Sequence, residues 1–161
     1  MTKLEKPDKS DLKKLQSIAD FQFGCGTGSV LFSGNIDIER SRGTNRIRFI
    51  YKDKTRICSF RVRDGFLVPS LIGGKLLHEN DLGLNVMVNE DSEPFVREGK
   101  SVFAKHIIDA DVKITRRDEV IIINQNKEFL GIGTAKISGK MMKEMNKGVA
   151  VSTRKGMKLE N

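Results

Sequence analysis

The sequence is poor in the residues that build metal centres, disulfide frameworks and membrane spans. Its two cysteines, Cys25 and Cys58, form no Cys-x-x-Cys pair, and its two histidines lie far from both. Because metal sites place their ligands in close pairs, we expect no zinc site, and without a secretion signal the thiols should be reduced. No apolar run approaches the roughly 18 residues of a membrane-spanning helix. We therefore expect a cytoplasmic protein without membrane contact, metal or cofactor.

The chain is also short. Its 161 residues allow one average domain or two small ones. A TIM barrel, at roughly 250 residues, does not fit. A hydrophobic content of 38% with 31% charged residues is typical of a folded protein. The totals therefore favour two small folded modules.

Acidic residues are too few to balance the basic ones, and the net charge is +8. The segment from Arg40 to Arg63 contains nine basic residues and one acid, Asp53, so its own net charge equals that of the whole chain. A concentrated positive charge favours an anionic partner, such as a phosphate backbone or an acidic membrane surface.

Periodicity and turn residues predict the elements of the first half. They are a helix capped by Ser10, short strands at residues 30–32 and 36–38, a hairpin at 46–62 that turns at Asp53-Lys54, a helix capped by Ser70, and a strand at 84–88. The polar stretch 89–92 that follows is typical of a linker. We therefore predict two modules, residues 1–88 and 89–161.

Basic residues alternate with apolar ones along the predicted hairpin. The pattern places Ile47, Phe49 and Tyr51 inside, and basic side chains on one outer face. The basic candidates for nucleic-acid binding are Arg46, Arg48, Arg61 and Arg63. The planar guanidinium group meets phosphate oxygens in pairs and stacks on bases. A half-exposed sheet can also be basic by chance, and an acidic protein surface would bind the same arginines.

The second half reads as one small helix among short strands. The predicted elements are a helix after Gly99 that includes Val102, Phe103, His106 and Ile107, strands at 119–123 and 128–138, a methionine-rich helix from Ser138 to Gly148, and a last strand at 149–154. Four consecutive apolar residues make 119–123 a buried strand.

Specific residues in this half resemble the PUA domain, a small RNA-binding pseudo-barrel attached to RNA-modifying enzymes. They are Arg97-Glu98-Gly99-Lys100, Val102-Phe103-Ala104-Lys105, Asp109-Ala110-Asp111, Asp118-Glu119-Val120, Gly133-Thr134-Ala135 and Ser138, and Gly148-Val149-Ala150-Val151. Within that family, these motifs are most similar to the C-terminal part of archaeal tRNA-guanine transglycosylase, the archaeosine enzyme. Residues 18–24 and 46–48 resemble the module that precedes the PUA domain there. One departure is Arg117, where the family usually has glycine.

The resemblance implies an α+β fold, with a small N-terminal helix-and-sheet module followed by a PUA-like β pseudo-barrel. It also implies that RNA lies across the helix after Gly99 and the adjoining strands. The residues that the resemblance implies as RNA contacts are Arg97, Lys100, Lys105, His106, Arg116, Arg154 and Lys155. For His106 a half-buried surface position is the alternative, and for the last two a solvated chain end.

We therefore expect an RNA-binding protein, with tRNA favoured, that acts as a non-catalytic docking module in tRNA modification. One alternative is an accessory subunit of a separately encoded tRNA-modifying catalytic subunit. Another is a small RNA-modifying enzyme, although the acid pairs at 109–111 and 118–119 flank turns and lack catalytic partners. The glycine-rich loop at 24–28 follows a helix and lacks the Gly-Lys-Ser/Thr ending of a nucleotide loop.

Overall fold

The computed structural model describes residues 3–159 and divides into two compact units that meet between Leu82 and Gly83. The predicted boundary after residue 88 falls too late, because residues 85–88 pair with strands of the second unit. The polar stretch 89–92 is a turn inside that unit. Asn89 donates its backbone N–H to His106, and its side chain accepts a hydrogen bond from the N–H of Ser92. Polarity there serves turn hydrogen bonding, which a linker would not need.

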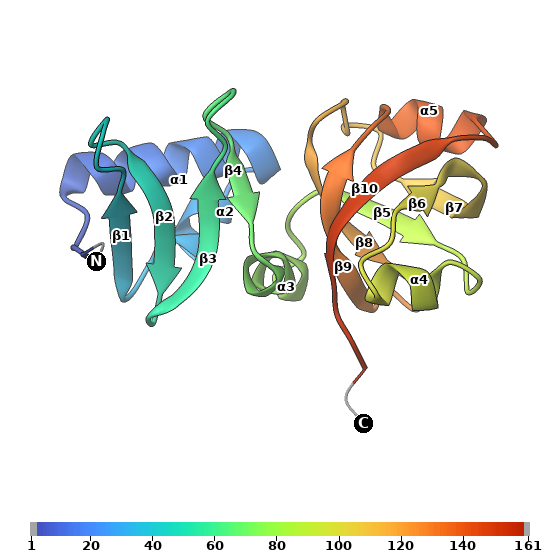
Figure 1. Cartoon of the computed structure of the whole chain (residues 1–161), viewed down its shortest axis with the longest axis horizontal. Helices are drawn as coiled ribbons and strands as arrows, with labels where there is room; N and C mark the ends of the chain where they lie inside the picture. Colours follow the sequence, from blue (N-terminus) through green and yellow to red (C-terminus); the bar gives the residue numbers. More distant parts are fainter. Residues whose placement is uncertain (1–2, 160–161) are drawn as a thin grey trace. The chain divides into compact units, whose positions relative to one another are not determined.

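The first unit is an antiparallel four-stranded sheet with helices packed on one face (Figure 1). Its elements are α1 (Lys9–Phe23), α2 (Thr27–Leu31), β1 (Ile36–Arg40), β2 (Ile47–Lys52), β3 (Thr55–Phe60), β4 (Leu67–Pro69) and α3 (Leu71–Glu79). The strand order is β1-β2-β3-β4. Helix α1 buries Leu15, Ala19 and Phe23. The predicted hairpin and the helix capped by Ser70 are both present.

Two local predictions in this unit are corrected. The N-cap of α1 is Asp8, which forms a capping box with Asp11, rather than Ser10. Residues 30–32 do not form a strand, because α2 covers most of them. A Cβ on Gly28 would lie 2.4 Å from the carbonyl oxygen of Gln16. The glycine therefore permits α2 to lie directly against α1, a tertiary contact that the local apolar run did not reveal.

The second unit is a six-stranded sheet that curls into a nearly closed barrel with two short helices. Its elements are β5 (Asn85–Val88), α4 (Glu93–Arg97), β6 (Val102–Phe103), the 3-10 turn η1 (Ala104–His106), β7 (Ile107–Ala110), β8 (Glu119–Ile123), β9 (Phe129–Ala135), α5 (Gly139–Glu144) and β10 (Val149–Gly156). The strand order is β6-β10-β9-β8-β5-β7, in which β5 and β8 are parallel. The α+β fold class and the barrel are confirmed.

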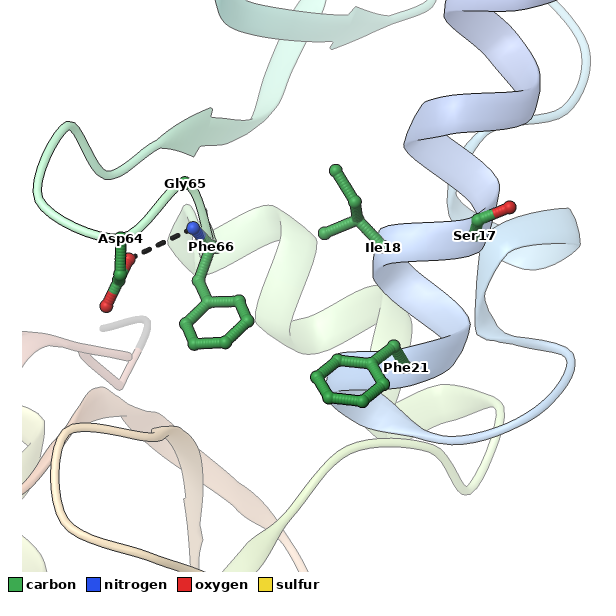
Figure 2. Close-up of a pocket in the computed structure, with 6 residues that line it drawn as sticks. All are labelled: Ser17, Ile18, Phe21, Asp64, Gly65 and Phe66. Atoms are coloured by element: carbon green, nitrogen blue, oxygen red, sulfur yellow. Dashed lines mark hydrogen bonds between the residues drawn. The ribbon is translucent and has the colours of Figure 1, made fainter.

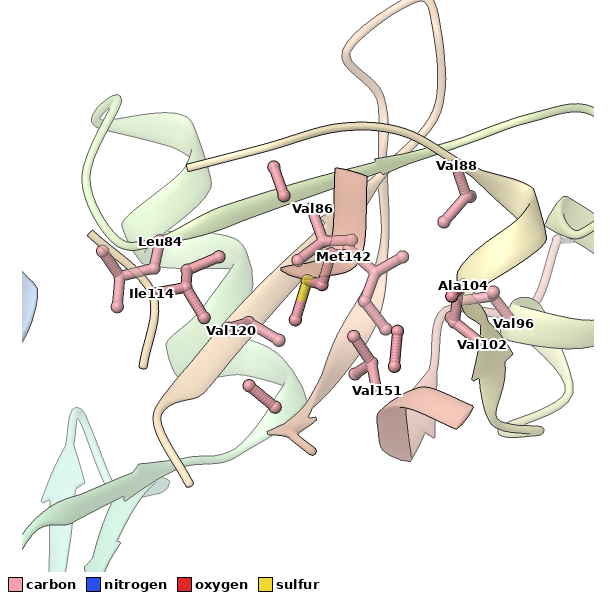
Figure 3. Close-up of a cluster of buried hydrophobic side chains, with 14 of the residues drawn as sticks. Leu84, Val86, Val88, Val96, Val102, Ala104, Ile114, Val120, Met142 and Val151 are labelled. Carbon is pink, nitrogen blue, oxygen red and sulfur yellow. The ribbon is translucent and has the colours of Figure 1, made fainter. Parts of the chain in front are cut away.

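Apolar side chains from every layer of the second unit meet in one core (Figure 3). The residues drawn there include Val86 of β5, Val120 of β8, Val151 of β10 and Met142 of α5, each at most 2% exposed. The two β9 glycines give no bulk to this core but let β10 approach. A Cβ on Gly133 would lie 2.5 Å from the carbonyl oxygen of Ser152.

The helix predicted after Gly99 is wrong. The chain forms β6, η1 and β7 there, and the helix of this region is α4, which ends before Gly99. Val102 is buried and Phe103 exposed, so the true period is two. The methionine-rich helix ends at Glu144, short of Gly148. Arg117 adopts φ +79 and donates its N–H to Ala135 at 2.8 Å, so the turn keeps its left-handed geometry without glycine.

Candidate RNA-binding surfaces

A helix end positions Lys100 in the second unit. The N–H of Gly99 donates to Val96 and that of Lys100 to Phe95, both at 2.9 Å, with Gly99 at φ +86. This pair of bonds around a left-handed glycine is the Schellman motif. It turns the chain back over α4, and the Lys100 ammonium lies 5.7 Å from the centroid of the Phe95 ring. Lys100 is 63% exposed and Phe95 52% exposed, so both face solvent.

The next segment continues with exposed basic and aromatic groups. Phe103 is 47% exposed at the end of β6, and Lys105 is exposed in η1. His106 is half-buried, and its carbonyl accepts the N–H of Asn89 at 2.9 Å. The same short run, residues 95–105, thus supplies two phenyl rings and two lysines to solvent.

Two arginines predicted to contact RNA form contacts within the fold. The Arg97 side chain is only 11% exposed, and it donates to the carbonyl of Met157 at 3.0 Å and to Glu93 at 3.3 Å. Arg154 donates to Glu119, a carboxylate with only 2% of its side chain exposed. Since an unpaired buried carboxylate is costly, Arg154 stabilises the barrel. Arg154 is nevertheless exposed, as are the remaining predicted residues, Arg116 and Lys155.

The open face of the first unit is set by strand register. Ile38, Ile50, Cys58 and Pro69 lie side by side across the sheet and are buried beneath the helices. The neighbouring row, which includes Phe49, is half-buried on the opposite face. The prediction that Phe49 and Tyr51 point inward is therefore wrong.

Two β-bulges cause this change of face. In β1, Glu39 and Arg40 pair with Phe49 and Ile47, so Arg48 is an extra residue. A second register shift lies between β2 and β3 at Ile50 and Tyr51. A bulge re-aims side chains that strict alternation would send to the other face. The bulges could not be inferred from the alternating pattern of the hairpin.

Phe49 is the centre of the candidate site on this open face. The guanidinium of Arg48 lies 5.0 Å from the centroid of its ring, and that of Arg56 lies 4.9 Å from the same centroid. Both arginines are exposed. Arg56 also faces Tyr51 across the strands. Arg56 was missed as a candidate, although the turn at 53–54 places it opposite Tyr51.

The other three predicted hairpin arginines lie outside this cluster. Arg46 is exposed just before β2, and Arg63 is exposed in the turn between β3 and β4. Arg61 donates to both carboxylate oxygens of Asp64, at distances from 2.6 to 3.0 Å. That guanidinium holds the pKa of Asp64 below its usual value. Arg61 is thus part of the turn structure.

The two surfaces share one chemistry, which is a cation held over a phenyl ring. Such cations can meet phosphate oxygens while the rings or guanidinium planes stack on unpaired bases. Within residues 3–159, no three histidine, cysteine or acidic side chains are grouped to hold a metal ion. In the same residues, no helix is long and apolar enough to cross a bilayer.

Comparison with known protein families divides the chain at the same place as the structure. Residues 13–82 match the patch-forming domain C2 of tRNA-guanine transglycosylase. Residues 85–157 match the PUA domain.

Curated relatives match almost the whole of this chain within longer polypeptides. The tRNA-guanine(15) transglycosylase of Methanobrevibacter smithii is 48% identical over 152 residues, which cover 93% of this chain and 23% of the relative. The enzyme of the same name from Thermococcus kodakarensis is 38% identical over 157 residues, 96% of this chain and 27% of the relative. The chain thus spans about a quarter of the length of these relatives and matches their C-terminal part, without the catalytic barrel.

Solved structures share the fold at low sequence identity. A hypothetical protein from Pyrococcus horikoshii superposes with a TM-score of 0.74 at 23% identity, over 98% of this chain and 96% of that one. A PUA domain protein from Aeropyrum pernix gives a TM-score of 0.68 at 15% identity, over 98% and 87% of the two chains.

Proposed function

We propose that this chain binds structured RNA, tRNA in particular. It belongs to the proteins that join a C2 domain of the tRNA-guanine transglycosylase type to a PUA domain, which is an RNA-binding fold. It acts as a docking module and performs no chemistry itself. The protein would bind this RNA in the cytoplasm.

One observation carries the proposal beyond family membership. Each unit holds exposed cations over a phenyl ring, Arg48 and Arg56 over Phe49 in the first and Lys100 over Phe95 in the second. A ring contact restrains a long cationic side chain before RNA arrives, so binding costs less side-chain entropy. The phosphate contacts would supply affinity, and unpaired bases near the rings would supply specificity.

A second role is compatible with the first. The longer relatives are named as transglycosylases, and this chain corresponds to about a quarter of their length. As an accessory subunit, the protein would bring tRNA to a separately encoded catalytic subunit.

The acidic residues considered as catalytic candidates give little support to an independent enzyme activity. Asp109 forms an ion pair with Lys143 at 3.2 Å, and that contact lowers its pKa. The side chain of Asp118 accepts hydrogen bonds from the backbone N–H and the hydroxyl of Thr115, at 2.8 and 3.0 Å. Both acids thus stabilise local structure through these contacts, and a general acid or base would need in addition a position facing the reacting group.

Binding of purified protein to tRNA tests the proposal, with and without the 3′ single-stranded end and at salt concentrations of about 50 to 200 mM. Four phosphate contacts would weaken binding roughly 100-fold across that range. Tight binding that requires the 3′ end supports recognition of an unpaired end by the PUA domain. Weak binding that does not distinguish tRNA from another polyanion contradicts the proposal.

A further inference from the structure

The first unit contains a groove that the RNA-binding proposal does not use (Figure 2). Its volume is about 330 Å³. Helix α1 contributes Ser17, Ile18 and Phe21, and the turn between β3 and β4 contributes residues 64–66. The ring of Phe21 lies nearly parallel to that of Phe66, with centroids 6.4 Å apart and planes 19° apart.

The groove leaves large apolar side chains in water. Phe21, which lines the groove, is 81% exposed, and Val62, which lies outside the lining but in the same turn as Phe66, is fully exposed. Scattered exposed apolar residues are normal, but aromatic and aliphatic groups gathered at a groove indicate a binding surface.

Hydrogen bonds hold both walls of the groove in place. In the turn, the N–H of Arg61 donates to Phe66 and that of Gly65 to Arg61, each at 2.8 Å. The Gln22 side chain joins α1 to β4, because it donates to the carbonyl of Leu67 at 2.7 Å and accepts that residue's N–H at 2.8 Å. A preformed groove binds a partner without an ordering cost.

The lining favours a protein partner over nucleic acid. The charged residue among the six that line the groove is Asp64, and the adjacent Arg61 guanidinium lowers the pKa of its carboxyl group. Because Arg61 neutralises that carboxylate and the lining includes no lysine or arginine, the groove offers phosphate no unpaired positive charge. An apolar protein side chain can fill the space against Phe21 and Phe66 without needing such a charge.

The length of the relatives identifies the partner. In the enzyme from M. smithii, the region that matches this chain is 23% of the polypeptide, and the remainder is joined to it covalently. Domains of one polypeptide pack against each other across interfaces of about 600 to 1,500 Å². A protein homologous to that remainder would therefore present a surface that fits the matching region.

We propose that the groove formed by Phe21 and Phe66 docks a protein homologous to the remaining three-quarters of these transglycosylases. This proposal rests on the accessory role described above. The partner would insert an apolar side chain against the two rings, and Phe21 and Val62 would become buried. Docking there leaves the open sheet face with Phe49 available to RNA, since the groove is formed by α1 and a turn.

The probe is the M. smithii enzyme truncated to remove the region that matches this chain, used only if it unfolds cooperatively. Its affinity for the intact protein is measured by calorimetry, with Phe21→Ser as the test variant. Ile72→Ser is the matched control, because Ile72 is 54% exposed on α3 and does not line the groove. Binding should weaken at least about tenfold with Phe21→Ser, as for an interface anchor, and should be unchanged with the control.

A wild-type protein that does not bind the folded probe, or that binds equally well as Phe21→Ser, overturns the proposal. A dimer of this chain that dissociates on Phe21→Ser in sedimentation assigns the groove to a second copy instead. Loss of tRNA affinity in the same variant assigns it to RNA. The tRNA titration is independent, so failed docking with intact tRNA binding leaves the RNA-binding proposal standing.

If the truncated enzyme does not fold, a chimera tests the docking proposal. In it, this chain replaces the matching region of the full M. smithii enzyme. With docking, the chimera unfolds in a single transition that Phe21→Ser divides into two. Identical unfolding profiles of the chimera and its variant overturn the proposal.

Discussion

Replacing Arg48 and Arg56 together by glutamine should clearly reduce the salt dependence of tRNA binding. It should reduce the free energy of unfolding only slightly. Both guanidinium groups are exposed and lie about 5 Å from the Phe49 centroid. Each exposed cation–π contact contributes about 0.5 to 1 kcal/mol, so the double variant should lose about 1 to 2 kcal/mol of folding free energy. The buried row at Ile50 and Cys58 is untouched, and the sheet should remain folded.

The effect on binding follows from counterion release. Each lost phosphate contact reduces the slope of log affinity against log salt by about 0.9, so two contacts reduce it by about 1.8. Between 50 and 200 mM salt, the wild-type protein should therefore lose about tenfold more affinity than the variant does.

The measurement is a filter-binding titration at four salt concentrations, with thermal unfolding to confirm the fold. The matched control replaces Lys13 and Lys14 by glutamine, which removes the same charge from exposed positions on α1. A double arginine variant with the wild-type slope would refute the assignment of the Phe49 cluster to RNA. An equal change in the lysine control would show that net charge alone matters.

Further predictions concern the barrel and the charged groups of the first unit. Arg154→Met should lower the free energy of unfolding by about 2 to 3 kcal/mol, because it removes the guanidinium that balances the buried charge of Glu119 and leaves the Thr134 hydroxyl as a neutral donor to that carboxylate; a double-mutant cycle with Glu119→Gln measures the coupling, and additive effects would contradict it. Gly133→Ala should cost at least about 2 kcal/mol in denaturant unfolding, since its Cβ would lie 2.5 Å from a carbonyl oxygen of β10; a near-neutral variant would show that β10 moves freely. Two lysines lower the pKa of Asp37 below 3.8, so this carboxylate stabilises the fold above that pH and its contribution is lost as the pH falls further. Acid unfolding of Asp37→Asn should accordingly show less pH dependence below about pH 4 than the wild type, and identical curves would exclude this role.

Some elements could be predicted because their signals are local. The turn at Asp53-Lys54 sits between two alternating runs, and the hairpin of β2 and β3 formed there. Ser70 caps α3 and Ser138 caps α5, since each hydroxyl accepts a backbone N–H three residues later. The all-apolar stretch of β8 is buried throughout.

Other elements were predicted wrongly because contacts with distant parts of the chain determine their structure. The segment after Gly99 has apolar residues at helical spacing, but Val149 and Val151 of β10 pair with Phe103 and Val102, and this pairing makes a strand. Residues 85–88 lie before a polar stretch that resembles a linker, yet β8 and β7 pair with them on either side. Hydrogen bonding to a distant strand outweighs a weak local preference.

The sequence by itself determined the basic character of the protein, its two-part α+β organisation and its resemblance to PUA proteins, because charge, composition and short motifs are written in the residues. Tertiary structure alone decided which contacts each cation forms within the fold. Arg97 and Arg154 bind a backbone carbonyl and a buried carboxylate that come from distant elements, whereas a bulge turns Arg48 toward Phe49 on the open face. A charge is available to a ligand only when the fold does not use it, and that depends on neighbours that the chain brings together from afar.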